Sequence, residues 1–513
     1  MSHNRSSWRR MTVLTVAALM TVAVGALPPA APASTRDAEY IVQFRGDIAA
    51  SARRALVAHA GGTLTRDVRI IDAVGAVLSP DEAEKLRRSR DIKAVTLNAP
   101  VSPTTLVNFD PNKMATAYNQ SAKSSNLWNS ATGKGVGVAV IDTGVAGDLP
   151  DFRVSQTDAR SRVIASAVVN PYAENARDSY GHGTLVAGIL AGNSGYRPAN
   201  DPLRGKYAGA APDANIISVK ISDEQGQATV LDAIYGIQFA VDHMADYNIR
   251  VINLSLTSTE PQSYKTDPLD AAVESAWFNG IVVVAAAGND GSASDAVSYA
   301  PANDPYVITV GAVDDKMTKG VTDDAITSWS SRGVTQDGFA KPELYAPGAH
   351  IQANLAPSSA FVSLCPSCIV NGSYIQAGGT SLAAPIIAGT VAGILEKRPS
   401  WTPDMVKGAL LNTTRTIPGG REVDALNAYN ASKDKLTSNI GLTPNTLVDA
   451  TTGAIDYTRA SWRLADWSSA PDLLQAGWSR ASWRCDCSTT DSGSIDPTRA
   501  SWRRASWRTD WTK

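Results

Sequence analysis

Through the middle of the chain, short apolar runs alternate with longer stretches that have apolar residues at helical spacing. The apolar runs predict strands at residues 136–141, 214–220, 251–256, 281–289 and 306–310, because strands covered on both faces of a parallel sheet are apolar throughout. Helices are predicted between them, at residues 231–247 and 270–279. Strands that alternate with helices favour an α/β fold with a doubly wound, mainly parallel sheet.

A separate pattern precedes this region. Strands are predicted at residues 39–44, 68–78 and 92–97, and helices at residues 48–59 and 80–86. These segments are enough for a small α+β domain with its own core, which we place at residues 34–105. The polar, proline-containing stretch at residues 100–112 is predicted to be the linker that follows it.

The first 33 residues are organised like an export signal. Arg5, Arg9 and Arg10 precede an uncharged apolar run at residues 11–27, and Ala31-Pro32-Ala33 has the small residues of a cleavage site. We therefore predict a signal peptide at residues 1–33 and a secreted, extracellular protein. An uncleaved membrane anchor is the alternative, which the Pro- and Ala-rich exit disfavours. Whether the signal is of the general or the twin-arginine type stays open.

The composition excludes several classes of protein. Of the 513 residues, 43% are hydrophobic and 19% are charged, so the chain can bury a sizeable core. The formal net charge of −2 provides no general attraction to nucleic acid or to an acidic membrane surface. After the export signal, no apolar run is long enough to predict a transmembrane segment.

The four cysteines form two close pairs, Cys365 with Cys368 and Cys485 with Cys487. Four cysteines are too few for a disulfide framework, so any bridge is predicted to be local. Export into an oxidising environment favours a disulfide between Cys365 and Cys368. A zinc site is the alternative, and it would need the distant pair to fold back and complete a set of about four ligands.

Three side chains that can carry chemistry adjoin predicted elements of the α/β region. Asp142 follows the strand at residues 136–141, at the end where open α/β sheets place their sites. His182 lies between two glycines at the start of an apolar helix. Ser381 follows Gly379-Thr380 at the start of another, where free N–H groups and the helix dipole stabilise negative charge. The setting of Ser381 suits a serine nucleophile, although each of the three residues has a structural alternative.

A fourth candidate is Asn289, which follows Gly288 at the end of the predicted strand at residues 281–289. A side-chain amide at this place can donate a hydrogen bond to an oxyanion. A simple turn asparagine is the alternative interpretation.

Five motifs together resemble the subtilisin-like serine proteases (subtilases). They are Ala139-Val-Ile-Asp-Thr-Gly-Val, Gly181-His-Gly-Thr-Leu-Val-Ala-Gly, Asn253-Leu-Ser-Leu, Ala286-Ala-Gly-Asn and Gly379-Thr-Ser-Leu-Ala-Ala-Pro, in the family's order. The resemblance covers about residues 106–430. It implies a subtilisin-like catalytic domain there, which hydrolyses peptide bonds in protein or peptide substrates.

The resemblance also implies a role for each residue. His182 takes the proton of Ser381, Asp142 orients the imidazole ring, and Asn289 stabilises the oxyanion of an acyl transfer. Ser255, Leu256 and Gly288 are implied to bind the substrate. The domain at residues 34–105 is implied to be an inhibitory propeptide, removed when the zymogen processes itself. No cofactor is required; calcium is common in the family, but no ligands can be assigned here.

The sequence departs from the family pattern at three places. Leu185 and Leu382 replace a usual His and Met, but neither position carries the chemistry. Thr257 replaces a usual Gly at the substrate-binding edge, which leaves the shape of the pocket open. Two other classes are weighed: an inactive homologue used for binding, which the filled catalytic positions disfavour, and an esterase, which the missing Gly-x-Ser-x-Gly motif disfavours.

Residues 431–513 are predicted to be a separate tail. The unit Arg-Ala-Ser-Trp-Arg recurs from Arg459 onward, and seven of the 12 tryptophans lie from Trp462 onward, so this is not an ordinary spacer. The tail is either an unstructured low-complexity segment or a segment whose exposed tryptophans bind a surface or polymer. On the second interpretation, a chain that ends near residue 435 is expected to fold and cleave peptides normally but to lose its attachment to the surface or polymer.

Overall fold

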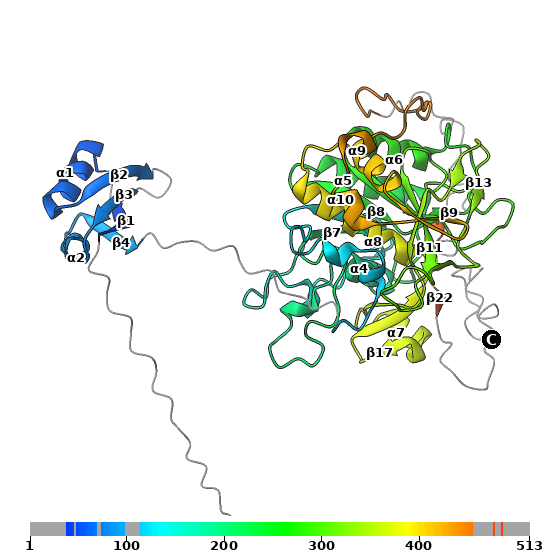
Figure 1. Cartoon of the computed structure of the whole chain (residues 1–513), viewed down its shortest axis with the longest axis horizontal. Coiled ribbons are helices and arrows are strands. Elements are labelled where there is room, and N and C mark those ends of the chain that lie inside the picture. The colour runs from blue at the N-terminus through cyan, green and yellow to red at the C-terminus, as the bar shows by residue number, and fades with distance from the viewer. Residues whose placement is uncertain are drawn as a thin grey trace, which may run out of the picture. The chain divides into compact units, whose positions relative to one another are not determined.

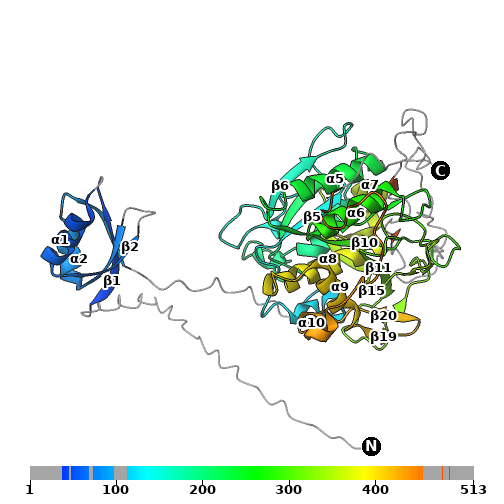
Figure 2. The ribbon, with the colours of Figure 1, turned by 90° about the horizontal axis from the view of Figure 1, so that it is seen from above.

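The computed structural model describes residues 37–45, 48–68, 73–97 and 113–454, together with the backbone of residues 476–477 and 484–485. The chain divides into two units, one up to residue 104 and one from residue 105 (Figures 1 and 2). The predicted export signal, the predicted linker and the tail from residue 455 onward, apart from residues 476–477 and 484–485, lie outside the described residues.

The smaller unit is a four-stranded sheet with two helices. Its elements are β1 (Ala38–Phe44), α1 (Ala50–Ala60), β2 (Thr63–Val68), β3 (Ala73–Leu78), α2 (Pro80–Arg87) and β4 (Ile92–Leu97). The strand order is β2-β3-β1-β4, and each neighbouring pair is antiparallel. The single strand predicted at residues 68–78 is wrong, because β2 and β3 run in opposite directions. Val42, Val57 and Leu86 belong to an apolar core within this unit.

A ten-stranded sheet forms the centre of the larger unit. Its strands are β5 (Gly137–Asp142), β6 (Val163–Val168), β7 (Asn215–Lys220), β8 (Ile249–Leu254), β10 (Val282–Ala286), β11 (Ile308–Asp314), β12 (Ala325–Ile326), β15 (Leu344–Pro347), β19 (Arg415–Ile417) and β20 (Gly420–Glu422). The strands in the order β20-β15-β11-β10-β8-β5-β7-β6 are parallel. β12 and β19 pair antiparallel with β11 and β20. The predicted mainly parallel α/β sheet is confirmed.

Helices cover both faces of this sheet. The helices of this unit are α3 (Tyr118–Ser121), α4 (His182–Ala191), α5 (Val230–Asp242), α6 (Pro268–Phe278), α7 (Ala360–Leu364), α8 (Thr380–Lys397), α9 (Pro403–Leu411) and α10 (Ala425–Tyr429). Of these, α4, α5, α6, α8 and α9 contact strands of the central sheet. α4 packs against α8, and α5 packs against α6. Figure 2 shows α5 and α6 on the opposite face of the sheet from α8. Within the described ranges, no helix is both long and apolar enough to cross a membrane.

Short strands lie outside the central sheet. They are β9 (Thr257–Ser258), β13 (Gly333–Val334), β14 (Ala340–Lys341), β16 (Ile351–Asn354), β17 (Ile369–Val370), β18 (Tyr374–Gly378), β21 (Ala476–Gly477) and β22 (Arg484–Cys485). β13 pairs with β14, and β18 pairs with β16, β17 and β22. β9 pairs with β21.

The order of the central strands reverses direction at β5. From β5 the chain continues through β6 and β7 on one side, and then crosses to β8, β10 and β11 on the other. The carboxyl ends of β5, β8 and β10 therefore lie side by side at a topological switch point, where open α/β sheets place their ligands. Asp142 ends β5, Asn253 lies at the end of β8, and Asn289 follows β10.

The larger unit extends beyond the boundary predicted at residue 430. The backbone N–H of Asn445 donates to the Glu274 carboxylate at 2.7 Å, and its side-chain amide donates to the Asp267 carbonyl at 2.8 Å. Leu447 and Val448 are buried against α6. A chain that ends near residue 435 would lose these contacts, so it is not expected to fold as stably as the full-length chain.

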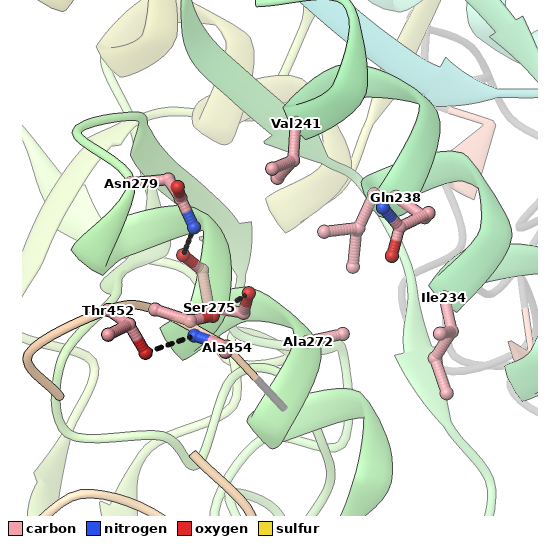
Figure 3. A pocket seen from close by; sticks show the side chains of 10 residues that line it. Ile234, Gln238, Val241, Ala272, Ser275, Asn279, Thr452 and Ala454 are labelled. Atoms are coloured by element: carbon pink, nitrogen blue, oxygen red, sulfur yellow. Dashed lines mark hydrogen bonds between the residues drawn. The ribbon is translucent and has the colours of Figure 1, made fainter. Parts of the chain in front are cut away.

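A pocket of about 340 Å³ lies where residues 452–454 meet α5 and α6 (Figure 3). Ser275 donates to the carbonyl of Gly453 at 2.5 Å, and Asn279 donates to the carbonyl of Ser275 at 2.9 Å. The pocket is lined by aliphatic and neutral polar residues, without a titratable side chain. It is therefore a packing feature of the α5–α6 face and offers no acid–base chemistry.

The predicted disulfide between Cys365 and Cys368 is confirmed. It joins the end of α7 to the start of β17. Because both sulfur atoms are bonded to each other, this pair cannot supply thiolates to a metal, which removes the zinc alternative.

Asp315, a buried residue just after β11, predicts a pH-dependent loss of stability. Burial raises the pKa of its carboxyl from 3.8 to about 7, so the folded state holds a proton that the unfolded state releases. The free energy of unfolding is therefore expected to be highest below about pH 4 and to fall as the pH rises to about 7. The total decrease is at most about 4 kcal/mol. Asp315→Asn is expected to remove this part of the pH dependence.

Urea unfolding of the Ser381→Ala chain between pH 4 and pH 8 measures this effect. The asparagine keeps an oxygen for the N–H of Met317, which Asp315 accepts at 3.0 Å. Asp323→Asn, at an exposed position, is the matched control. Equal pH profiles for Asp315→Asn and the parent chain would contradict the prediction.

Candidate active site

Asp142 and His182 are in direct contact inside the larger unit. The Nδ1 atom of His182 lies 2.9 Å from Oδ1 and 3.1 Å from Oδ2 of Asp142. The side chains are 1% and 0% exposed, respectively. The backbone N–H of Thr143 also donates to Asp142 Oδ1, at 2.7 Å. The carboxylate thus favours the tautomer with its proton on Nδ1, which leaves Nε2 as the basic atom of the ring.

The glycines on both sides of His182 make this contact sterically feasible. Gly181 has a φ of +114°, in the left-handed region that a side chain disfavours. A Cβ atom on Gly183 would lie 2.1 Å from the carbonyl oxygen of Gly144. The first turn of α4 can therefore approach the loop after β5 only with glycine at position 183.

Asp178 joins the same two segments through three hydrogen bonds. Its Oδ1 accepts from the Thr143 hydroxyl at 2.8 Å and from the Gly181 N–H at 2.7 Å, and its Oδ2 accepts from the Thr184 N–H at 2.7 Å. Burial raises the pKa of the carboxyl, and these three donors oppose the rise. Asp178 is not among the predicted site residues, although an acidic residue just before a helix is a recognisable capping signal.

Asp178→Ala is expected to lower kcat/KM by about 10- to 100-fold, because Thr143, Gly181 and Thr184 lose their acceptor and the His182–Asp142 geometry loosens. Asp178→Asn keeps one oxygen for Thr143 and Gly181 and loses the bond to Thr184. Its kcat/KM should therefore lie between those of the parent enzyme and Asp178→Ala. The measurement is peptide cleavage at several pH values, with thermal unfolding alongside. A purely structural role would lower the unfolding temperature and leave the pH profile of correctly folded enzyme unchanged.

Ser381 is the second residue of α8, and it is held to the end of β8. Its hydroxyl donates to the Ser255 carbonyl at 3.3 Å, and the Ser255 hydroxyl donates to the Ser381 carbonyl at 2.8 Å. The Asn253 amide donates to the Ser255 hydroxyl at 2.9 Å. α8 and α4 pack together, so the helices whose first turns contain Ser381 and His182 are neighbours.

Asn289 contacts the residue immediately before Ser381. Its Oδ1 accepts from the Thr380 N–H at 3.0 Å and from the Thr380 hydroxyl at 3.2 Å. The Gly288 N–H donates to the Thr380 hydroxyl at 3.1 Å. The oxygen of the amide is thus committed to Thr380, which leaves its nitrogen as the donor end.

The other predicted substrate-binding residues lie beside these groups. Ser255 and Leu256 connect β8 to β9, and both are buried. Gly288 precedes Asn289 after β10. For calcium, the described part of the chain contains no group of three or more His, Cys, Asp or Glu residues that could hold a metal ion.

The model of the subtilase family matches residues 133–444, which is more than half of the chain. That span contains Asp142, His182, Asn289 and Ser381. The chain belongs to the subtilase family. As a subtilisin-like serine protease, it is a hydrolase that acts on protein or peptide substrates.

Two proteases of Bacillus subtilis extend this comparison. This subtilase is 39% identical to serine protease AprX of Bacillus subtilis (strain 168) over 288 residues, which cover 55% of this chain and 62% of AprX. It is 30% identical to subtilisin E of the same strain over 397 residues, which cover 75% of this chain and 87% of subtilisin E. The chain therefore spans less than two thirds of AprX and most of subtilisin E.

The chain also aligns with solved structures. The crystal structure of a cold adapted subtilisin-like serine proteinase aligns with 56% of this subtilase and 84% of its own chain, with 28% identity and a TM-score of 0.40.

Proposed function

We propose that this subtilase is a secreted serine endopeptidase that uses Ser381 as nucleophile, His182 as general base and Asp142 as the group that orients His182. The observation that carries the proposal is the buried His182–Asp142 contact at 2.9 Å, with His182 on a helix that packs against α8, whose second residue is Ser381. A carboxylate that holds one ring nitrogen leaves the other to exchange a proton with a hydroxyl.

The reaction proceeds in two acyl transfers. Ser381 Oγ attacks the carbonyl carbon of the peptide bond while His182 Nε2 takes the hydroxyl proton. The tetrahedral intermediate collapses when His182 returns that proton to the leaving amine, which breaks the C–N bond and forms the acyl-enzyme. Water then attacks the ester, with His182 again accepting and returning a proton, and Ser381 is released.

Negative charge on the substrate oxygen is stabilised by two donors. One is the Asn289 amide nitrogen, whose orientation follows from the bond between Thr380 and Asn289 Oδ1. The other is the backbone N–H of Ser381, since N–H groups in the first turn of a helix have no acceptor within the helix. The positive end of the α8 dipole acts in the same direction.

Substrates bind as extended peptides. Residues 255–258, which include β9, offer backbone groups that can pair with a peptide strand, as in other cases of strand addition to an exposed edge. Gly288 follows β10, the strand that pairs with β8. Thr257, in place of the family's usual glycine, brings a side chain to this edge and narrows the choice of substrate residue there.

The smaller unit is proposed to be an inhibitory propeptide that the enzyme removes itself. It has its own core and is separated from the larger unit near residue 104, so a single cut between them would release it. The Cys365–Cys368 disulfide agrees with export to an oxidising environment.

The test is hydrolysis of casein and of an internally quenched peptide, with and without a sulfonyl fluoride that labels active serines. We expect hydrolysis that the reagent abolishes, with the added mass located on the peptide that contains Ser381. Binding of casein without hydrolysis would instead indicate an inactive homologue. Hydrolysis of esters but not of peptides would indicate an esterase, and either result would overturn the proposal.

A further inference from the structure

Two short strands from the C-terminal tail pair with the edges that border Ser381. β21 runs antiparallel to β9, with Ala476 opposite Ser258 and Gly477 opposite Thr257. β22 runs antiparallel to β18, with Arg484 opposite Gly378 and Cys485 opposite Ala377. The two strands are only six residues apart in the sequence.

Both partner strands lead directly to the reacting groups. β9 begins two residues after Ser255, whose carbonyl accepts the hydroxyl of Ser381. β18 ends at Gly378, three residues before Ser381. The edges to which the tail pairs are thus the backbone segments on the β8 side and on the α8 side of the nucleophile.

We propose that the two strands β21 and β22 are a tethered ligand of the substrate groove, which pairs with β9 and β18 and competes with peptide substrates. The inference rests on the function proposed above, since it takes β9 as a substrate edge. Backbone pairing of an extended segment with a strand edge is the mode by which a peptide substrate would bind. The tail thereby acts as an inhibitor in cis, and it requires no particular side chain at the two strands.

The length of the segment allows one tail to make both contacts at once. Seven peptide units join Gly477 to Arg484, and an extended chain of that length reaches about 25 Å. A ligand on the same chain acts at an effective concentration in the millimolar range. Even weak pairing, with a dissociation constant of about 0.1 mM, would then occupy most grooves and raise the apparent KM for other peptides by about tenfold.

A disulfide trap tests the placement without relying on activity. Antiparallel partners have Cα atoms about 4.5–5.5 Å apart, within the range that a disulfide bridges. Ser258→Cys and Ala476→Cys are combined in a full-length chain with Ser381→Ala, Cys485→Ser and Cys487→Ser. The control chain carries Ala470→Cys in place of Ala476→Cys. Its cysteine lies on the same tail but not at the position that pairs with Ser258.

We expect mild oxidation to join the two introduced cysteines at least tenfold faster in the first chain than in the control. Peptide mapping by mass spectrometry identifies the bond. Equal rates in the two chains would mean that the tail meets β9 only by diffusion on its tether, and would overturn the proposal.

Kinetics of the full-length active enzyme test the competition. Proline has no N–H and does not fit a paired strand, so Ala476→Pro with Arg484→Pro should release the groove. The apparent KM for a short peptide is expected to fall about tenfold with kcat unchanged, whereas Thr490→Pro, outside both strands, should alter neither. Unchanged KM in the double variant would overturn the proposal.

The two experiments separate the inference from the proposed function. If the disulfide forms but the parent enzyme cleaves no peptide, the pairing of the tail is supported and the proposed peptidase activity is contradicted. Full peptidase activity with no trap and no change in KM would do the reverse. A cut within residues 476–485 in the active enzyme, absent from the Ser381→Ala chain, would also support binding of this segment in the groove.

Discussion

Replacing Ser381 by alanine is expected to lower the turnover of peptide substrates by about 10⁶-fold, the order found when the nucleophile of subtilisin is removed. The hydroxyl is the atom that forms the acyl-enzyme, and the groups that remain can only bind substrate and stabilise charge. The same chain should keep the unit at residues 37–97 attached, because its removal is proposed to be the enzyme's own first reaction. Intact mass and N-terminal sequencing report the second effect.

The matched control for this experiment is Ser363→Ala, an exposed serine on α7 that should be processed and active like the parent chain. Appearance of processed Ser381→Ala protein in the absence of any other protease would show that self-processing is wrong. Turnover within tenfold of the parent enzyme would show that Ser381 is not the nucleophile.

Replacing Asn289 by aspartate is expected to lower kcat by at least 10²–10³-fold while KM changes by less than about threefold. Aspartate keeps an oxygen for the Thr380 N–H, which Asn289 accepts at 3.0 Å, but it removes the N–H donor for the oxyanion. The loss therefore appears in the transition state and not in the bound substrate. Steady-state kinetics with one short peptide measure both constants.

Asn289→Ala completes the comparison, because it removes both the donor and the contact with Thr380. If the amide served only to hold Thr380, the aspartate variant would keep most of its activity and the alanine variant would lose it. If the amide donates to the oxyanion, both variants lose activity. A parent-like kcat for Asn289→Asp would contradict the proposed role.

Sequence patterns predicted those parts of the fold whose signal is local. The buried strands β5, β7, β8, β10 and β11 are continuous apolar runs, and α8 is apolar nearly all round, so each could be placed from its own residues. The strand β6 was missed because its residues alternate between half-buried and exposed and include serine and alanine, which leaves a weak pattern.

The parts that were missed depend on distant partners. Asp178 connects the loop after β5 to the start of α4, and nothing near it in the sequence indicates that Thr143 is one of its donors. Residues 431–454 have no strand or helix period, yet Asn445 and Leu447 fasten them to α6. Two-residue strands such as β21 and β22 carry no propensity signal, since their pairing is set by the edge they meet.

The position of Ser381 on α8 ties activity to the stability of the whole unit. α8 has 18 residues, is buried over nearly its whole length and contacts β8, β10 and β11, so the nucleophile lies on a buried helix of the core and not on a loop that can unfold alone. Segments of that kind open only when the domain unfolds cooperatively. The fraction of activity that survives heating therefore equals the fraction of molecules that have not globally unfolded. Residual activity after heating can thus be used to follow the unfolding of this unit.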